Sequence, residues 1–221
     1  MKPLNTYIDH TLLKPTATNL DIIELCKEAI AHEFFSVCVN SCYVSLAKEQ
    51  LKNTNVKVCS VIGFPLGAAS TQAKVDEAKT ALSHGADEID MVINLGFLKS
   101  KDFDAVWQDI EAVKKIMPKN VLKVILETCY LDHLEIIKAS ELAVQSGADF
   151  IKTSTGFGSG GATMNDVKLM KSVAKNTAKI KASGGIRDKK TALEYINLGV
   201  ERLGTSSGIA IVTDKTSNSN Y

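Results

Sequence analysis

The feature that most constrains the fold of this chain is a regular alternation between short apolar runs and longer segments with helical spacing. Residues 20–31 carry apolar side chains at helical intervals, and Thr18 with Asp21 can form a capping box in front of them. Residues 35–39, which follow, have the length and apolar content of a buried strand. Strands that alternate with helices are typical of a parallel sheet joined by crossover helices.

The same alternation continues through most of the chain. Strands are predicted at residues 7–9, 35–39, 56–62, 89–93, 122–126, 150–152, 180–182 and 202–204. Helices are predicted at residues 20–31, 43–51, 71–83, 103–113, 133–145, 165–174 and 191–197. A short repeat between helix and strand supports this division: Gly85-Ala86-Asp87, Gly147-Ala148-Asp149 and Gly199-Val200-Glu201. Glycine at its first position suits the left-handed residue that ends a helix.

Eight strand and helix units in one small α/β domain predict a closed (β/α)8 barrel, the TIM barrel. An open, doubly wound parallel sheet is the alternative fold. The barrel is expected to occupy residues 1–212 as a single catalytic domain. Residues 213–221 are polar and rich in Ser and Asn, and they are expected to form a C-terminal tail.

Composition excludes several classes of function. The chain has 221 residues, of which 45% are hydrophobic and 23% charged, as in an ordinary globular domain. Its net charge of +1 provides no electrostatic reason to bind nucleic acid or an anionic membrane. No apolar run approaches the roughly 20 residues that span a bilayer, and the N-terminus lacks the apolar core of a signal peptide. Five cysteines without framework spacing indicate a reducing compartment, so a cytoplasmic location is expected.

Two lysines within strand patterns indicate the chemistry. Lys152 lies in an apolar run that ends in Thr153-Ser154-Thr155-Gly156, and Lys181 lies in a similar run that ends in Ser183-Gly184-Gly185. An unpaired buried ammonium is poorly solvated, and losing its proton makes the amine a nucleophile. A second lysine nearby would favour the neutral form of the first. The pattern therefore predicts imine chemistry on a phosphorylated carbonyl compound.

Polar residues at other strand ends are candidates for the same site. Active sites of such barrels lie at the carboxyl ends of the strands. The candidates there are Asp9, Cys38, Asp90, Asn94, Glu127, Lys152 and Lys181, with Lys123 deeper in its strand. If Asp90 faces inward, it can meet the lysines and exchange protons with them. Ion pairs that merely fill the barrel are the alternative for each of these residues. No metal site is predicted, because Cys38 and Cys42 lack a partner pair with zinc-ligand spacing.

Two glycine loops suit a phosphate group. Residues 183–185 follow the seventh predicted strand, and residues 204–208 follow the eighth. Barrels often bind phosphate with these two loops and the start of a short extra helix, here expected at 206–212.

With these residues in view, the chain resembles the deoxyribose-phosphate aldolases, a family of class I aldolases. The resemblance covers nearly the whole length and depends on six motifs that occur in order. They are Tyr7-Ile8-Asp9-His10-Thr11-Leu12-Leu13-Lys14-Pro15, Val61-Ile62-Gly63-Phe64-Pro65-Leu66-Gly67, Glu88-Ile89-Asp90-Met91-Val92-Ile93-Asn94, Phe150-Ile151-Lys152-Thr153-Ser154-Thr155-Gly156, Lys181-Ala182-Ser183-Gly184-Gly185-Ile186-Arg187 and Arg202-Leu203-Gly204-Thr205-Ser206-Ser207.

The resemblance implies a role for each site residue. Lys152 would form the Schiff base, Lys181 would tune it and help to move protons, and Asp90 would donate and accept protons through water. Supporting residues would be Asp9 and Lys123 in the lysine network and Tyr221 at the C-terminus, which can reach the site in some relatives. Cys38 and Thr155 would lie near the substrate, and the phosphate would contact Gly156, Gly184, Gly185, Ser206 and Ser207. Phe157 stands where some relatives have a lysine, so a salt bridge from that position to the substrate is in doubt.

The implied reaction is the reversible cleavage of 2-deoxy-D-ribose 5-phosphate to acetaldehyde and D-glyceraldehyde 3-phosphate. The imine itself accepts the electrons, so no cofactor is expected. The expected partners are small phosphosugars and aldehydes and a second copy of the chain in a homodimer, but neither nucleic acid nor a membrane. Two alternatives remain: another Schiff-base aldolase or a transaldolase, and a phosphosugar isomerase or other phosphate-binding barrel with structural lysines.

Overall fold

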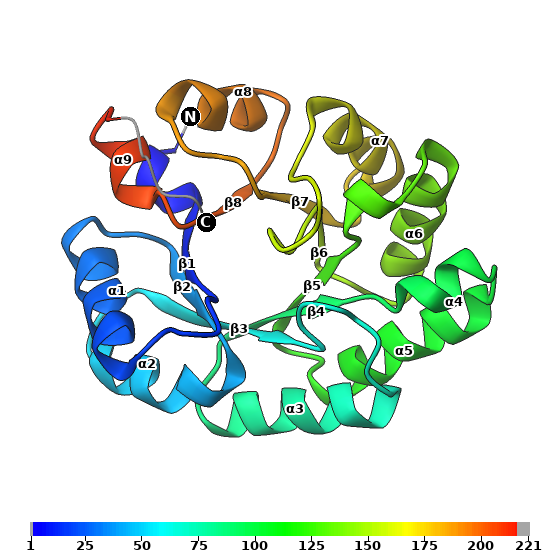
Figure 1. The fold of residues 1–221 in the computed structure, drawn as a ribbon, viewed down its shortest axis with the longest axis horizontal. Helices are drawn as coiled ribbons and strands as arrows, with labels where there is room; N and C mark the ends of the chain where they lie inside the picture. The colour runs from blue at the N-terminus through cyan, green and yellow to red at the C-terminus, as the bar shows by residue number, and fades with distance from the viewer. Residues whose placement is uncertain (1, 216–221) are drawn as a thin grey trace.

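The chain folds into a closed barrel of parallel strands surrounded by helices (Figure 1). The computed structural model describes residues 2–215. The strands are β1 (Ile8–Leu12), β2 (Ser36–Val39), β3 (Lys57–Ile62), β4 (Glu88–Val92), β5 (Val121–Ile125), β6 (Phe150–Lys152), β7 (Lys179–Ser183) and β8 (Arg202–Thr205). They pair in chain order, and β1 closes the barrel against β8 with Asp9 beside Gly204. The predicted (β/α)8 barrel is therefore confirmed, and the open sheet is excluded.

Helices cover the outside of the barrel. The α-helices are α1 (Asn19–Ala31), α2 (Val44–Gln50), α3 (Thr71–Ser83), α4 (Leu95–Lys99), α5 (Phe103–Ile116), α6 (His133–Gln145), α7 (Met164–Ala174), α8 (Lys189–Asn197) and α9 (Gly208–Val212). Short 3₁₀ helices are η1 (Leu4–Tyr7), η2 (Ser41–Tyr43) and η3 (Thr128–Tyr130). The capping box of Thr18 and Asp21 forms at the start of α1. The sequence did not predict α4, whose first turn is capped by the side chain of the site candidate Asn94.

The repeated glycine and acid have a clear structural purpose. Gly85, Gly147 and Gly199 all have positive φ, as expected after a helix. The acid two residues later ties two neighbouring strands together, because its carboxylate accepts a backbone N–H from the start of the strand before it. These bonds join Asp87 to Val58, Asp149 to Leu122 and Glu201 to Ile180.

The main apolar core lies between the strands and the helices. The barrel interior is different, because buried charged side chains occupy its centre. All strands run the same way, so their carboxyl ends, and the loops that follow them, gather at one end. None of the helices described is long and apolar enough to cross a membrane. Tyr221 lies outside the described residues.

Candidate active site

A single carboxylate, Asp90 on β4, holds the three strand lysines together. Its Oδ2 lies 2.7 Å from the amine of Lys152 and 2.7 Å from that of Lys181. Its Oδ1 lies 2.8 Å from the amine of Lys123. The inward orientation of Asp90 expected from strand alternation is thus what the barrel shows, and the four side chains form one cluster.

A second set of charges surrounds this cluster. Asp9 on β1 places Oδ2 2.5 Å from the Lys181 amine, and its Oδ1 accepts from Arg202 at 2.7 Å. Glu88 lies 2.6 Å from Lys123 and 3.1 Å from Arg202. Asp9 therefore joins the lysine network directly.

Burial and charge oppose each other in this centre, and charge prevails. Burial alone would raise the pKa of Asp90, but the three lysines hold it well below its usual range. Burial disfavours the charged form of Lys181, yet Asp9 and Asp90 raise its pKa above the usual value. The Lys123 pKa is raised in the same way, by Asp90, Cys59 and Glu88 against the effect of burial. Lys181 and Lys123 thus remain cations, and Asp90 remains a carboxylate.

Lys152 is held less firmly than the other two lysines. Lys123 and Lys181 each contact two carboxylates, whereas Lys152 contacts one, through an oxygen that it shares with Lys181. With Arg202 included, four basic groups meet three acids, so the centre is balanced when one amine is neutral. The sequence argument treated Lys152 as unpaired. In the fold it has a carboxylate partner, and the charged groups around it include one more base than acid.

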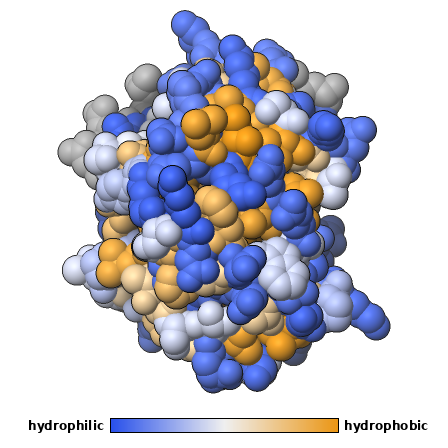
Figure 2. All heavy atoms as spheres, turned by 90° about the vertical axis from the view of Figure 1, so that its right-hand side faces the viewer, coloured by the Kyte–Doolittle hydropathy of each residue, from blue (hydrophilic) through white to orange (hydrophobic). Residues whose placement is uncertain are grey.

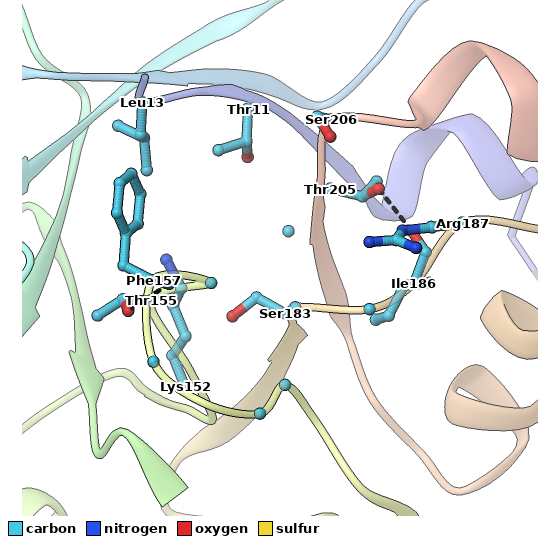
Figure 3. Close-up of a pocket in the computed structure, with 17 residues that line it drawn as sticks. Thr11, Leu13, Lys152, Thr155, Phe157, Ser183, Ile186, Arg187, Thr205 and Ser206 are labelled. Carbon is cyan, nitrogen blue, oxygen red and sulfur yellow. Dashed lines mark hydrogen bonds between the residues drawn. The ribbon is translucent and has the colours of Figure 1, made fainter. Parts of the chain in front are cut away.

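A cavity of about 340 Å³ opens above Lys152 at the carboxyl end of the barrel (Figure 3). The Lys152 amine points into it beside Thr155 and Phe157, while Thr11 and Leu13 lie across from them. Asp90, Lys123 and Lys181 do not line the cavity but lie in the buried layer beneath. Lys152 is therefore the lysine that connects the charged centre to a space for a ligand.

The two glycine loops meet at the other side of this cavity. Gly156, Gly184, Gly185 and Ser206 line it. Gly156 and Gly185 have φ values of 86° and 81°, and a Cβ at either position would meet no atom within 4 Å, so these backbones face open space. Ser207 is buried outside the lining, and its N–H donates to the Thr205 hydroxyl at 2.9 Å.

Sequence reasoning missed one residue at this end. Arg187 lines the cavity with its guanidinium group near Thr205 and Ile186 (Figure 3). Its place directly after the Gly184-Gly185 turn was the available signal, because a side chain there leaves β7 at the carboxyl end of the barrel.

Cys38 lies below the cavity, in contact with Cys59 on the neighbouring strand. A hydrogen bond from Cys59 lowers the Cys38 thiol pKa, against the effect of burial. Donor atoms of Cys38, Cys59 and Asp90 lie within 4.8 Å of one another, a spacing that a metal ion can use. However, both Asp90 oxygens already contact lysine amines, and these positive charges oppose a divalent cation. We therefore assign no metal here.

The barrel, with a lysine amine at the base of its open end, defines the chain as an enzyme of the aldolase class. The solved structure of an aldolase named QR15 superposes with a TM-score of 0.92 at 46% identity, covering 96% of each chain. The model of the DeoC/LacD family of aldolases matches residues 4–212. The chain belongs to this family.

Named relatives are similar over their whole length. A deoxyribose-phosphate aldolase of Mycoplasma capricolum subsp. capricolum is 55% identical over 218 residues, which cover 99% of this chain and 98% of that protein. A deoxyribose-phosphate aldolase of Finegoldia magna is 58% identical over 209 residues, which cover 95% and 98%.

Proposed function

We propose that this protein is a class I aldolase that reversibly cleaves 2-deoxy-D-ribose 5-phosphate to acetaldehyde and D-glyceraldehyde 3-phosphate. The observation that carries the proposal is the position of Lys152. Its amine enters the cavity from a buried centre with one excess positive charge, close to a carboxylate that can exchange protons. The relatives named above support the choice of substrate.

In this proposal, the neutral amine of Lys152 attacks the C1 aldehyde of the open-chain sugar. Loss of water from the carbinolamine gives an iminium ion, whose positive charge draws electrons from the C2–C3 bond. Removal of the C3 hydroxyl proton then breaks that bond, releases glyceraldehyde 3-phosphate and leaves an enamine on Lys152. Protonation of the enamine carbon and hydrolysis release acetaldehyde and restore the amine.

Asp90 and Lys181 serve the proton transfers in this cycle. Asp90 is a carboxylate at rest, so it first accepts a proton through water and later returns it. Lys181 stays charged, and its amine lies 2.7 Å from the Asp90 oxygen that Lys152 also contacts. Asp9 and Lys123 keep these groups in place through their ion pairs.

The phosphate is assigned to the glycine-loop end of the cavity. Backbone groups at Gly156, Gly184 and Gly185 and the chain at Ser206 and Ser207 surround that end in this proposal. Arg187 adds a positive charge that matches a phosphate dianion. Phosphate and amine then lie at opposite ends of a ligand that spans the cavity.

A substrate panel tests the proposal. Purified protein should release acetaldehyde from 2-deoxyribose 5-phosphate faster than it releases acetaldehyde from unphosphorylated deoxyribose or glycolaldehyde from ribose 5-phosphate. Absence of acetaldehyde from 2-deoxyribose 5-phosphate would contradict the assignment, and isomerisation without cleavage would favour the isomerase alternative.

Two further proposals concern the cellular location and the oligomeric state. We propose a cytoplasmic location, supported by the free thiols of all five cysteines. We also propose a homodimer, supported by exposed Leu134, Tyr130 and Phe97 on α6, η3 and α4. Figure 2 shows hydrophobic patches among hydrophilic side chains on the side of the molecule that carries these helices. Light scattering that finds a monomer at micromolar concentration would contradict the dimer.

The tail of residues 213–221 is the last part of the proposal. We propose that the phenol of Tyr221 assists proton transfer at the enamine carbon. Deleting Tyr221 should slow deuterium incorporation into acetaldehyde in heavy water, and equal rates would remove this residue from the mechanism.

A further inference from the structure

Glu127 is a buried acid behind the cavity wall that the mechanism above does not use. It follows β5 and is 2% exposed. Its φ of 55° lies in the left-handed region that L-residues rarely adopt. A buried carboxylate in a strained backbone conformation needs strong partners, so its hydrogen bonds show what it does.

Both oxygens of Glu127 accept hydrogen bonds from one residue of the cavity lining, and Oε1 also accepts from the Cys129 thiol at 3.9 Å. Oε1 accepts the backbone N–H of Thr155 at 3.1 Å, and Oε2 accepts the Thr155 hydroxyl in a short hydrogen bond. Thr155 lies three residues after Lys152, so this acid fixes a group next to the reactive amine.

The hydrogen-bonding capacity of the Thr155 hydroxyl is therefore almost used up. A hydroxyl has one proton and two lone pairs. The proton is donated to Glu127, and one lone pair accepts the N–H of Phe157 at 3.0 Å. One lone pair remains. Toward the cavity, Thr155 can only accept a hydrogen bond, and the charge on Glu127 makes it a stronger acceptor.

We propose that Glu127 is a positioning residue that sets the polarity of Thr155, so that this wall selects a substrate hydroxyl. A hydroxyl group can donate to the free lone pair, whereas a carbonyl oxygen would meet a second acceptor. The inference depends on the proposed function, which supplies the hydroxyl. In the synthetic direction, D-glyceraldehyde 3-phosphate carries this hydroxyl on C2, between its aldehyde carbon and its phosphate. When the aldehyde lies at Lys152 and the phosphate at the glycine loops, C2 lies beside Thr155.

The variant Glu127→Gln tests the polarity with little change of shape. An amide offers one acceptor oxygen and one donor NH₂, so it can no longer accept both protons of Thr155. If its oxygen takes the backbone N–H, its NH₂ faces the Thr155 hydroxyl, whose proton must turn toward the cavity. The wall would then present a donor where it presented an acceptor.

The measurement is the ratio of kcat/KM for D-glyceraldehyde 3-phosphate to kcat/KM for 3-phosphopropanal, which lacks the hydroxyl, with acetaldehyde as donor. Wild type should prefer the hydroxylated aldehyde on the order of 10–100-fold, as for one hydrogen bond to a charge-assisted acceptor. Glu127→Gln and Thr155→Val should each lose most of this preference, and the double variant should lose no more than Thr155→Val alone. Thr155→Ser should keep it, as should the surface control Glu135→Gln.

Trapping acetaldehyde on Lys152 with borohydride separates two kinds of failure. If trapping is intact and Glu127→Gln keeps the wild-type ratio, or if the losses of the two single variants add, the role of Glu127 is overturned. Should Glu127→Gln not fold, equal ratios in Thr155→Ser and Thr155→Val would overturn it. Absence of trapping in wild type would overturn the proposed function, and this inference with it.

Discussion

The chain buries a lysine against an aspartate in two places, and only one of these lysines reaches the cavity. Outside the barrel, Lys74 on α3 lies 2.5 Å from Asp109 on α5, and both are almost fully buried. The Lys74 amine also donates to the Val92 carbonyl, and the second oxygen of Asp109 accepts from Thr71. Inside the barrel, Lys152 shares one oxygen of Asp90 with Lys181.

The two places differ in the balance of basic and acidic groups and in whether an amine reaches the cavity. The outer pair matches one cation to one anion, and its atoms have protein partners. The inner cluster has one base more than it has acids, and one of its amines enters a cavity. Burial of a lysine is therefore not what makes a reactive amine. Burial lowers the pKa of Lys74 as well, but its amine reaches no cavity, whereas the Lys152 amine lies in an unbalanced cluster next to a space that admits a carbonyl compound.

The largest effects on turnover are expected in the inner cluster. Lys181→Leu and Asp90→Leu should each lower turnover by about 10²–10⁴-fold, the usual contribution of acid–base groups. Their effects on stability should differ, because Lys181→Leu removes the excess charge whereas Asp90→Leu deprives three lysines of a shared carboxylate. Steady-state kinetics and urea unfolding measure both. Near-normal turnover in either variant would reassign that residue to structure.

The outer pair should show the opposite result. Lys74→Met leaves Asp109 buried without its cation and should lower the free energy of unfolding by about 3–5 kcal/mol. Turnover per folded molecule should stay close to wild type, since Lys74 does not line the cavity. The double variant Lys74→Met with Asp109→Leu should recover much of the stability. A loss of turnover in folded Lys74→Met would erase the distinction between the two places.

A smaller expected effect is a difference between the inner cluster and the outer pair in how the free energy of unfolding depends on pH. The inner cluster lowers the pKa of Asp90 and Asp9 below their usual value near 3.8, Asp9 mainly through Arg202 and Lys181 against the effect of burial. Groups with lowered pKa stabilise the fold above their unfolded pKa, and this contribution is lost as pH falls through the folded value. Stability should therefore decline below about pH 4, less steeply in Asp90→Asn but with the wild-type slope in the double variant Lys74→Met with Asp109→Leu, which removes both charges of the outer pair. Equal slopes in all three would contradict the assigned charges.

Much of this account could be predicted from the strand pattern. Period-two alternation tells which side of a strand a residue faces, so Asp90, Lys152 and Lys181 could be placed together before their contacts were known. The repeated glycine and acid likewise marked the turns between helix and strand. A helix-ending glycine with positive φ depends on the few residues around it, so the short repeat was enough to locate these turns.

What could not be predicted depends on contacts between distant residues. Lys74 stands in an amphipathic helix that resembles a surface helix, and only the packing of α3 on α5 shows that its amine is buried. Glu127 was a strand-end candidate without a task, because its partner Thr155 lies 28 residues away. The excess charge around Lys152 arises from strands spread over the whole barrel.

The central claim is that the imbalance around Lys152 makes this amine the nucleophile. Borohydride reduction in the presence of acetaldehyde, followed by peptide mass mapping, tests the claim most directly. An ethyl group on Lys152, with Lys74, Lys123 and Lys181 unmodified and none on the Lys152→Met variant, is the predicted result. An adduct confined to Lys181 or Lys74, or no adduct on any lysine, would contradict it.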